Sequence, residues 1–441
     1  MKTLIRNVDV LTLDAAGTVL HNAAIAVDGD RIAAIGEAPP DFAPDEVIDG
    51  YNHLAMPGFF NAHCHAPMTF ERGWAEDLPL DRWFNERIWV AESALTPDDV
   101  YWGAALAACE MIQGGTVAFN DHYFYMDRVA EVVEQAGMKA ALTWCQFGIG
   151  ADKEVGADLN GTLAFVDRWQ GGAGGRIRTV LGPHSPYVCP PEFLREISAQ
   201  AREHGLPLHI HLAESPEQVE NSLAAYGLTP PAHLEACGVF DGPCVAAHAL
   251  YLTPDDIGIL ARRGVTVAHC PITYMKLAMG VNNLGELMKA GVNVALGTDG
   301  PGSNNDMDMK AVVRFAALLQ KHHARDAEAL PGDLPLRMAT ANGARAMGFG
   351  ESGVLEAGRP ADLVLFDLDQ PHLYPRHDVV ANLVHAAKAS DSRFEIVMLT
   401  RSLAAANAIA AGNRPSTSKC VTMRHPHGGG SKRSTPRAPT R

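Results

Sequence analysis

The sequence lacks any long apolar run. No stretch of its 441 residues is apolar throughout the length of a membrane span, and the first apolar stretch is interrupted by Arg6, Asn7 and Asp9. A membrane span needs about 20 consecutive apolar residues, and a signal peptide needs an unbroken apolar segment. We therefore expect no membrane span, no signal peptide and no membrane partner.

Paired cysteines and an excess of positive charge are also missing. The eight cysteines include no C-x-x-C pair, which favours reduced thiols in a cytoplasmic protein over a disulfide framework. Lys and Arg number 36 against 51 Asp and Glu, which gives a net charge of −15. A polyanion is a poor partner for such a chain, so we expect no nucleic-acid partner.

Acidic residues are absent from the end of the chain. Residues 414–441 contain seven Lys and Arg, no Asp or Glu, and many Pro, Ser, Thr and Gly. This composition cannot build a core, so we predict a disordered basic tail. A role in anion binding is the less favoured interpretation.

Apolar runs alternating with amphipathic stretches occupy residues 57–355. Parallel strands covered on both faces read as continuous apolar runs, and eight such units match the size of a (β/α)8 barrel. The chain is therefore predicted to be an α/β protein with a TIM-like barrel. The strand candidates are residues 54–65, 116–121, 139–148, 178–187, 207–214, 244–251, 265–271 and 293–301.

The two ends of the chain predict a smaller β unit. Residues 1–56 contain strand-like runs at 4–14 and 24–36, the second with a turn at Asp28-Gly29-Asp30. Beyond a helix expected at 339–349, residues 358–369 supply another strand, which we expect to join the N-terminal sheet. Residues 1–56 and 356–413 are thus predicted to form a small β-sandwich beside the barrel.

The predicted barrel strands end in titratable or amide side chains. Barrel enzymes build their sites at the C-terminal ends of the strands, so these side chains should meet at one polar mouth. Burying them unpaired in a core would cost about 1–3 kcal/mol each. The strand-end residues are His63, His65, Asp121, His122, Gln146, His184, His211, Glu214, His248, His269 and Asp299.

Two strand ends carry alternating histidines. His63 and His65 share one side of the first strand, and His209 and His211 share one side of the fifth. Neutral imidazole is the commonest ligand for zinc and iron. We choose His211 as the third ligand because it is nearer the mouth, whereas His209 is expected one layer deeper. Glu214 is left beside the metal as an acid–base group.

Asp299 completes the predicted metal centre. It lies where the eighth strand meets the Gly-rich loop GTDGPGSNND (297–306). A lone Asp there is more often a helix cap. With the histidines, it is better interpreted as a ligand that also accepts the proton of metal-bound water. Three His and one Asp with an open position are typical of a catalytic metal site. One divalent ion is expected, with zinc favoured over iron or manganese.

The motifs PGFFNAHCH, HLAES, GTDG and GRPADLVLFD resemble the amidohydrolase superfamily from residue 3 to about residue 390. The resemblance implies a barrel carrying a β-sandwich made from both chain ends. It also implies that His63, His65, His211 and Asp299 bind the metal. Glu214 would then shuttle a proton and His248 would orient the attacking water.

Within the superfamily, the deaminase branch is favoured. Many two-metal members carry a carboxylated Lys on strand four, but the only lysines between His65 and His209 are Lys139 and Lys153, neither of them there. The stretches HAPMTFERGWAEDLPLDRWF, GPHSPY and KLAMG are most similar to methylthioadenosine/S-adenosylhomocysteine deaminases. The implied reaction is attack of metal-held hydroxide on the amidine carbon of a heterocycle, with release of ammonia.

Five substrate contacts are predicted. The resemblance suggests Glu92 and His184 as contacts for a ribose or its equivalent. Gln146 could read the edge of a heterocycle, although an amide serving the backbone is as common. Trp74, which clusters with two other tryptophans after the first strand, could stack on a flat ring, although packing on the barrel rim is the commoner role. Ser303 follows Asp299 in the Gly-rich loop.

Several alternatives stay open. The resemblance implies an Arg after the third strand, to bind the homocysteine carboxylate, and a small polar residue after the seventh strand. Residues 143–154 contain no Arg, and Tyr274 follows the seventh strand. These departures admit a purine base, pterin, pyrimidine or triazine as substrate instead of an adenosine-type nucleoside. A hydrolase of the same fold could remove chloride or alkylamine from a triazine-like ring or open a cyclic amide. A non-catalytic barrel that only binds a ligand is the third possibility. The family analogy also suggests a homodimer.

The end of the chain departs from the family pattern. After residue 393 we expect a closing strand and helix, but the sequence reads FEIVMLTRSLAAANAIAAGN and then the basic tail. A shifted reading frame near residue 390, or a foreign extension, would explain the change. An uninterrupted frame that matches close relatives, found by sequencing the encoding DNA, would rule this hypothesis out.

Overall fold

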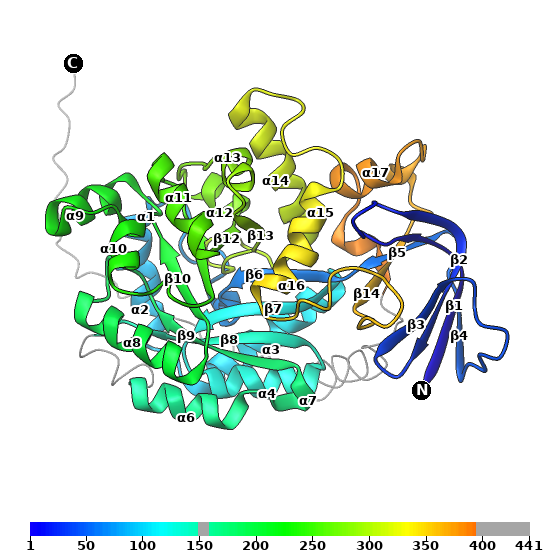
Figure 1. Ribbon diagram of the computed structural model, residues 1–441, viewed down its shortest axis with the longest axis horizontal. Helices are drawn as coiled ribbons and strands as arrows, with labels where there is room; N and C mark the ends of the chain where they lie inside the picture. Colours follow the sequence, from blue (N-terminus) through cyan, green and yellow to red (C-terminus); the bar gives the residue numbers. More distant parts are fainter. Residues whose placement is uncertain (149–157, 394–441) are drawn as a thin grey trace, which may run out of the picture.

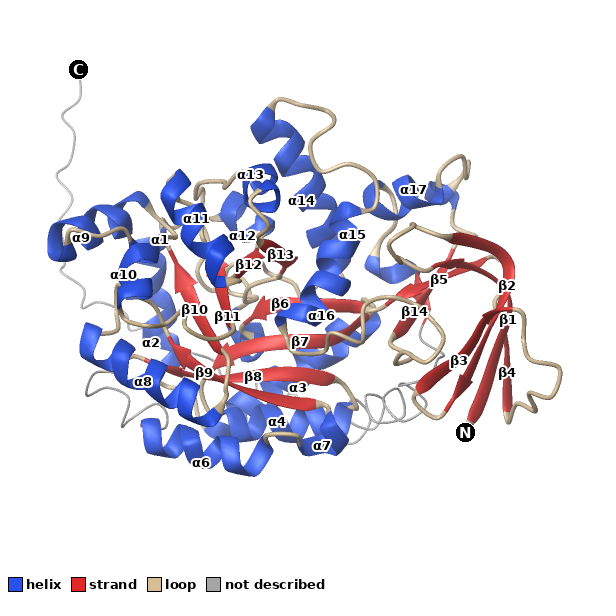
Figure 2. Ribbon diagram, viewed as in Figure 1, coloured by secondary structure: helices blue, strands red, loops and turns tan. Residues whose placement is uncertain are grey.

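The computed structural model describes residues 1–148 and 158–393, which form a barrel and an adjoining smaller sheet (Figure 1). The N-terminal strands lie together beside the barrel, and the strand β14 from near the C-terminal end of the described chain lies among them (Figure 2). None of the described helices combines the length and apolarity that a membrane span requires. Residues 394–413 and the predicted tail 414–441 lie outside the described residues.

The barrel confirms the predicted (β/α)8 fold. Eight strands follow one another in sequence order, and each neighbouring pair is parallel. Their residues are nearly all buried, because helices cover the outer faces of the strands. The strands are β6 (Phe59–Cys64), β7 (Thr116–Tyr123), β8 (Lys139–Gln146), β9 (Ile177–Pro183), β10 (Leu208–Leu212), β11 (Cys244–His248), β12 (Thr266–His269) and β13 (Asn293–Leu296).

The first and last barrel strands are joined at the mouth. The backbone N–H of Asp299 donates to the His63 carbonyl at 3.0 Å, and the N–H of Thr298 donates to Oδ1 of Asn61 at 3.0 Å. Asn61 in turn donates from Nδ2 to the Thr298 hydroxyl at 2.7 Å. The seam between β6 and β13 is therefore closed by contacts that include the first predicted metal ligand and the last.

Helices surround the barrel, and several have capping residues at their ends. Thr96 and Thr253 form capping boxes at the starts of α3 and α11, and Gly205 and Gly264 end α8 and α11 in the left-handed conformation. The longer helices are α3 (Pro97–Gln113), α4 (Met126–Ala136), α6 (Leu159–Trp169), α8 (Pro191–His204), α9 (Pro216–Tyr226), α10 (Pro230–Ala236), α11 (Pro254–Arg263), α14 (Met309–Ala324) and α17 (Val379–His385).

Short helices shape the mouth and the seam. A 3-10 turn (Ala66–Glu71) follows the first histidine pair, and a helical segment then runs through α1 (Leu80–Trp83), a π-helical turn (Phe84–Ile88) and α2 (Trp89–Glu92). The others are α7 (Gly172–Gly175), α12 (Pro271–Lys276), α13 (Leu284–Lys289), α15 (Leu334–Ala339) and α16 (Ala341–Ala346). The helix predicted at 339–349 is shorter than expected, because the backbone turns at Thr340 (φ −124°, ψ −92°).

The smaller sheet combines both ends of the chain, as predicted. Its order is β15-β14-β5-β1-β2-β3, with β4 also paired to β1. β14 lies antiparallel to β5, which places the strand expected at 358–369 in the N-terminal sheet. The strands are β1 (Lys2–Leu11), β2 (Val19–Asp28), β3 (Arg31–Gly36), β4 (Glu46–Asp49), β5 (His53–Pro57), β14 (Leu363–Asp367) and β15 (Ser392–Arg393). The domain boundaries at 56/57 and 355/356 stay predictions.

Candidate metal centre and active site

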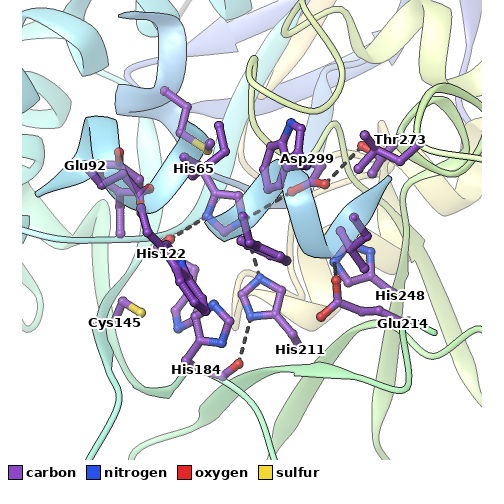
Figure 3. Close-up of a pocket in the computed structure, with 18 of the residues that line it drawn as sticks. His65, Glu92, His122, Cys145, His184, His211, Glu214, His248, Thr273 and Asp299 are labelled. Carbon is purple, nitrogen blue, oxygen red and sulfur yellow. Dashed lines mark hydrogen bonds and ion pairs between the residues drawn. The ribbon is translucent and has the colours of Figure 1, made fainter. Parts of the chain in front are cut away.

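The strand-end histidines and Asp299 meet at the barrel mouth (Figure 3). Nε2 of His63 and Nε2 of His65 lie 3.4 Å and 3.2 Å from Oδ1 of Asp299. Nε2 of His211 lies 3.4 Å from Nε2 of His65. His63, His65 and His211 offer nitrogen atoms close enough to hold one ion, and so does the group of His63, His248 and Asp299. The predicted ligands therefore come together from β6, β10 and the loop after β13.

Backbone carbonyls set the tautomers of two of these histidines. Nδ1 of His65 lies 2.6 Å from the His122 carbonyl, and Nδ1 of His211 lies 2.8 Å from the His184 carbonyl. Because a carbonyl only accepts, each Nδ1 carries a proton. In the neutral rings, the two Nε2 atoms then present lone pairs to each other across 3.4 Å. Two facing lone pairs are unfavourable, so a metal ion or a proton between the two nitrogen atoms stabilises this arrangement.

The spacing of the donor atoms fits a tetrahedral ion. Atoms that lie about 2.0–2.1 Å from such an ion are about 3.3 Å from one another. The separations found here are 3.2–3.4 Å. In addition, Nε2 of His63 is buried and has no hydrogen-bond partner among the described residues. The residues present therefore fit a divalent metal such as zinc.

Burial and the neighbouring charge shift the pKa values of the clustered histidines in opposite directions. Burial lowers the pKa of His63 to about 3 and the pKa of His211 well below its usual value, so both rings are neutral. Burial also disfavours charge on His65, but the hydrogen bond and the charge of Asp299 outweigh it and raise the pKa to about 9. The site thus favours positive charge between His65 and Asp299.

The second oxygen of Asp299 is held by two hydroxyl groups. Thr273 Oγ1 donates to Oδ2 of Asp299 at 3.0 Å, and Ser303 Oγ donates to the same oxygen at 2.8 Å. Ser303 is buried and is not among the residues that line the cavity, and its role as a substrate contact stays a prediction. The loop folds back and directs its hydroxyl to Asp299. Sequence analysis did not single out Thr273.

Glu214 lies beside this cluster, between a phenol and an imidazole. Tyr187 donates its hydroxyl hydrogen to Oε1 of Glu214 at 2.7 Å, and Nε2 of His248 lies 3.8 Å from Oε2. Burial raises the pKa of Glu214, and this effect exceeds the opposing effects of His248 and Tyr187. Tyr187 was missed at the sequence level as a functional residue, although it ends the stretch GPHSPY.

His248 is held in an unusual backbone conformation. Its φ is +73°, a left-handed value that only glycine adopts freely, and Ala249 follows with φ +50°. Nδ2 of Asn282 donates to both of their carbonyls at 3.1 Å. Strain of this kind persists where the surroundings fix the backbone, and it is concentrated at functional sites.

A cavity opens beside these groups and extends away from Glu214. In Figure 3, Glu92 and Glu214 lie on opposite sides of His65 and His211. Glu92 and His184 line the cavity, and their predicted contact with a ribose stays a prediction. Burial raises the pKa of Glu92 to about 7. The apolar lining residues are Met68, Leu80, Trp83, Phe84, Ile88, Trp89, Phe124, Phe147, Leu277 and Met279.

Two further predicted substrate contacts lie off the cavity lining. Trp74 lies in the turn after the 3-10 helix with the Arg87 guanidinium over its ring, and Trp83 and Trp89 line the cavity instead. Gln146 is buried at the end of β8, where its backbone carbonyl accepts a hydrogen bond from the backbone N–H of His184 at 2.8 Å. Both residues therefore lie outside the cavity lining, and their contact with a substrate stays a prediction.

Comparison with known proteins agrees with this geometry. The model of the amidohydrolase family matches residues 54–413. The chain belongs to the amidohydrolase family. This finding confirms the resemblance drawn from the histidine, HLAES and GTDG motifs.

Relatives within this family cover nearly the whole chain. It is 46% identical over 391 residues to a 5-methylthioadenosine/S-adenosylhomocysteine deaminase of Pelotomaculum thermopropionicum, covering 88% of this chain and 90% of the relative. Identity to the Moorella thermoacetica protein of the same name is 46% over 394 residues, covering 88% and 91%.

Solved structures of similar proteins include zinc enzymes. An adenosine deaminase of Xanthomonas campestris with bound zinc has a TM-score of 0.85 and 34% identity, with 93% of this chain and 98% of that chain covered. An atrazine chlorohydrolase from Arthrobacter aurescens, complexed with zinc, has a TM-score of 0.80 and 26% identity, with 92% and 99% covered. Two solved structures with the overall fold of this amidohydrolase family member therefore contain zinc.

Proposed function

We propose that this protein is a metal-dependent hydrolytic deaminase whose substrate is an adenosine-type nucleoside such as 5′-methylthioadenosine or S-adenosylhomocysteine. One observation carries the proposal. A cluster of three imidazoles and a carboxylate opens onto a cavity beside Glu214, whose pKa burial raises. The relatives named above act on such nucleosides by their names.

His63, His65, His211 and Asp299 would hold one divalent ion, with zinc favoured over iron or manganese because zinc occupies the similar structures. A bound ion supplies Lewis acidity that makes a water molecule nucleophilic at neutral pH. The chain itself positions the proton transfers, because Glu214, His248 and Asp299 line the cavity.

The protein residues divide the proton transfers between them. Asp299 accepts the proton of the attacking water, held in place by Thr273 and Ser303. His248 orients that water. Glu214, kept protonated by burial, donates to the ring nitrogen next to the carbon under attack. A C–O bond forms, and Asp299 passes the proton that it accepted to the amino nitrogen. The C–N bond then breaks, ammonia leaves, and the remaining hydroxyl proton returns to Glu214 as the ring carbonyl forms.

The far part of the cavity supports a nucleoside as substrate. Glu92 can accept hydrogen bonds from ribose hydroxyls, and His184 can donate to them or accept from them. The apolar side chains offer a surface for a thioether substituent. Tyr274, whose bulk admitted a smaller heterocycle as substrate in the sequence analysis, does not line the cavity. Its hydroxyl instead accepts from the N–H of Cys270 at 2.8 Å. A homodimer and a cytoplasmic location stay predictions.

Ammonia release tests this proposal directly. The purified protein, with its metal content measured, is assayed on adenosine, methylthioadenosine, S-adenosylhomocysteine, guanine, pterins and aminotriazines. Turnover of the adenosyl compounds is expected. Turnover confined to free bases or triazines would overturn the nucleoside assignment while leaving a deaminase.

Removal of chloride or alkylamine from a triazine is the second candidate. It is favoured by the similarity to atrazine chlorohydrolase, whose structure covers most of this chain. Chloride release from a chlorotriazine, without ammonia release from any member of the panel, would establish it in place of deamination.

A further inference from the structure

A hydrogen-bonded ring of buried polar side chains lies one layer beneath the metal site. Nδ1 of His63 lies 2.9 Å from Nε2 of His209, and Nδ1 of His209 lies 3.5 Å from the Thr143 hydroxyl. Thr143 Oγ1 lies 3.5 Å from Oδ1 of Asn120, and Nδ2 of Asn120 donates to the Ala62 carbonyl at 3.1 Å. The ring leaves β6 at His63, crosses β10, β8 and β7, and returns to β6 at the preceding residue.

The composition of this layer calls for an explanation. The interior of a (β/α)8 barrel is usually filled by branched apolar side chains. Here His63, Asn120, Thr143 and His209 are all at most 1% exposed. A buried polar group that has no partner costs about 1–3 kcal/mol. These four side chains avoid that cost only through their contacts with one another and with Ala62, which indicates that their arrangement serves a purpose.

Metal binding gives the ring a single direction. If Nε2 of His63 presents its lone pair to an ion, the His63 proton resides on Nδ1, which must donate. His209 must then accept at Nε2 and carry its own proton on Nδ1, facing Thr143. The Thr143 hydroxyl accepts this proton and donates its own to Oδ1 of Asn120, whose amide donates to Ala62. Each group has the donor or acceptor that its neighbour needs.

We infer that His209 is a positioning residue that fixes His63 in the metal-binding tautomer and orientation, and that Thr143 holds His209 in the matching tautomer. The inference rests on the proposed role of His63 as a ligand. It separates the two histidines of HIH (209–211), because His211 faces the ion and His209 acts through another ligand. Ligand-orienting partners of this kind typically change metal affinity by about 10- to 100-fold.

Zinc affinity, measured by competition with a chromophoric chelator, tests this inference without an activity assay. His209→Leu removes the acceptor and should weaken zinc binding by about 10- to 100-fold. His209→Gln places an amide oxygen where it can accept from Nδ1 of His63, and should restore most of the affinity. The absorption spectrum of the cobalt-substituted protein should shift in the Leu variant and return toward wild type in the Gln variant.

Thr143 provides a second, milder pair of variants in case the His209 variants fail to fold. Thr143→Val has nearly the same volume but no hydroxyl, and should weaken zinc binding several-fold, whereas Thr143→Ser should not. Thr162→Val is the matched control, because it removes a buried hydroxyl of α6 that has no hydrogen-bond partner among the described residues. It should leave zinc affinity unchanged.

The outcomes separate this inference from the proposed function. A wild-type protein that binds no divalent ion would overturn the proposed function and this inference with it. Tight zinc binding by the wild type, retained in both His209→Leu and Thr143→Val, would overturn the inference alone. An equal loss of affinity in His209→Leu and His209→Gln would also overturn it, since the acceptor would then play no part.

Discussion

The Tyr187 hydroxyl lies 2.7 Å from Oε1 of Glu214 and donates its hydrogen to that oxygen, while Oε2 faces His248. The phenol therefore stabilises the carboxylate form of a group whose pKa burial raises. The balance between these two effects determines the pH up to which Glu214 keeps the proton it has to donate.

Replacing Tyr187 should move this balance in a known direction. In Tyr187→Phe the carboxylate loses a donor, so the pKa of Glu214 rises further. Because the protonated form is the active one, the alkaline limb of the kcat profile should shift to higher pH. We also expect kcat to fall by about tenfold from lost orientation. An unchanged alkaline limb would assign it to another group.

Removing the proton donor itself should have a larger effect. Glu214→Gln keeps the shape but cannot transfer a proton, so kcat should fall by about 10²- to 10⁴-fold. Zinc content should remain that of the wild type, because Glu214 is not among the proposed ligands. Loss of the metal in this variant would instead make Glu214 a ligand.

The two hydroxyls on Asp299 can be tested together. Ser303→Ala and Thr273→Val each remove one donor to Oδ2, and the double variant leaves that buried oxygen without either donor. We expect about a tenfold loss of kcat in each single variant and weaker zinc binding in the double variant. A raised KM with unchanged kcat in Ser303→Ala would confirm Ser303 as a substrate contact.

Glu92 should make nucleoside binding dependent on pH. Burial raises its pKa to about 7, so it is neutral below that pH and anionic above it. A carboxylate accepts hydrogen bonds from hydroxyls more strongly than a carboxylic acid does, so KM for nucleosides should fall as the pH rises through 7. Glu92→Gln should abolish this trend, and a substrate without the ribose hydroxyls should not show it.

The ion pair between the barrel and the smaller sheet should contribute to stability. Lys139 at the start of β8 contacts the buried carboxylate of Asp362, which also accepts from the Ser352 hydroxyl at 2.6 Å. Asp362→Ala would leave a largely buried ammonium unpaired and should cost about 3–5 kcal/mol in urea unfolding. The double variant Lys139→Met/Asp362→Leu should recover part of that loss.

The barrel and the convergence of its strand ends were accessible from the sequence for a physical reason. Apolar runs ending in His63, His211 or Asp299 leave few places for their polar ends other than a shared mouth. His211 was distinguished from His209 because it lies nearer the C-terminal end of the strand. The match of the amidohydrolase family model to residues 54–413 covers all three of these residues.

The substrate side of the cavity was less predictable. Trp74 and Ser303 lie in loops, where no periodicity fixes the direction of a side chain, and the sequence alone did not reveal that Ser303 turns toward Asp299. Likewise, Tyr187 acquires its importance only through the 2.7 Å contact with Glu214, which joins two segments from different strands. The break at Thr340 within the predicted helix 339–349 arises from packing that local propensity does not encode.

The seam between β6 and β13 has a consequence for how the molecule assembles. His63 and Asp299 meet there through the backbone hydrogen bond that closes the barrel, and both belong to the proposed ligand set. If the proposed ion binds there, it links the first and last barrel strands, which are far apart in the sequence. The ligand set is complete only when these two strands are adjacent, so ion uptake measured during refolding should report closure of the barrel.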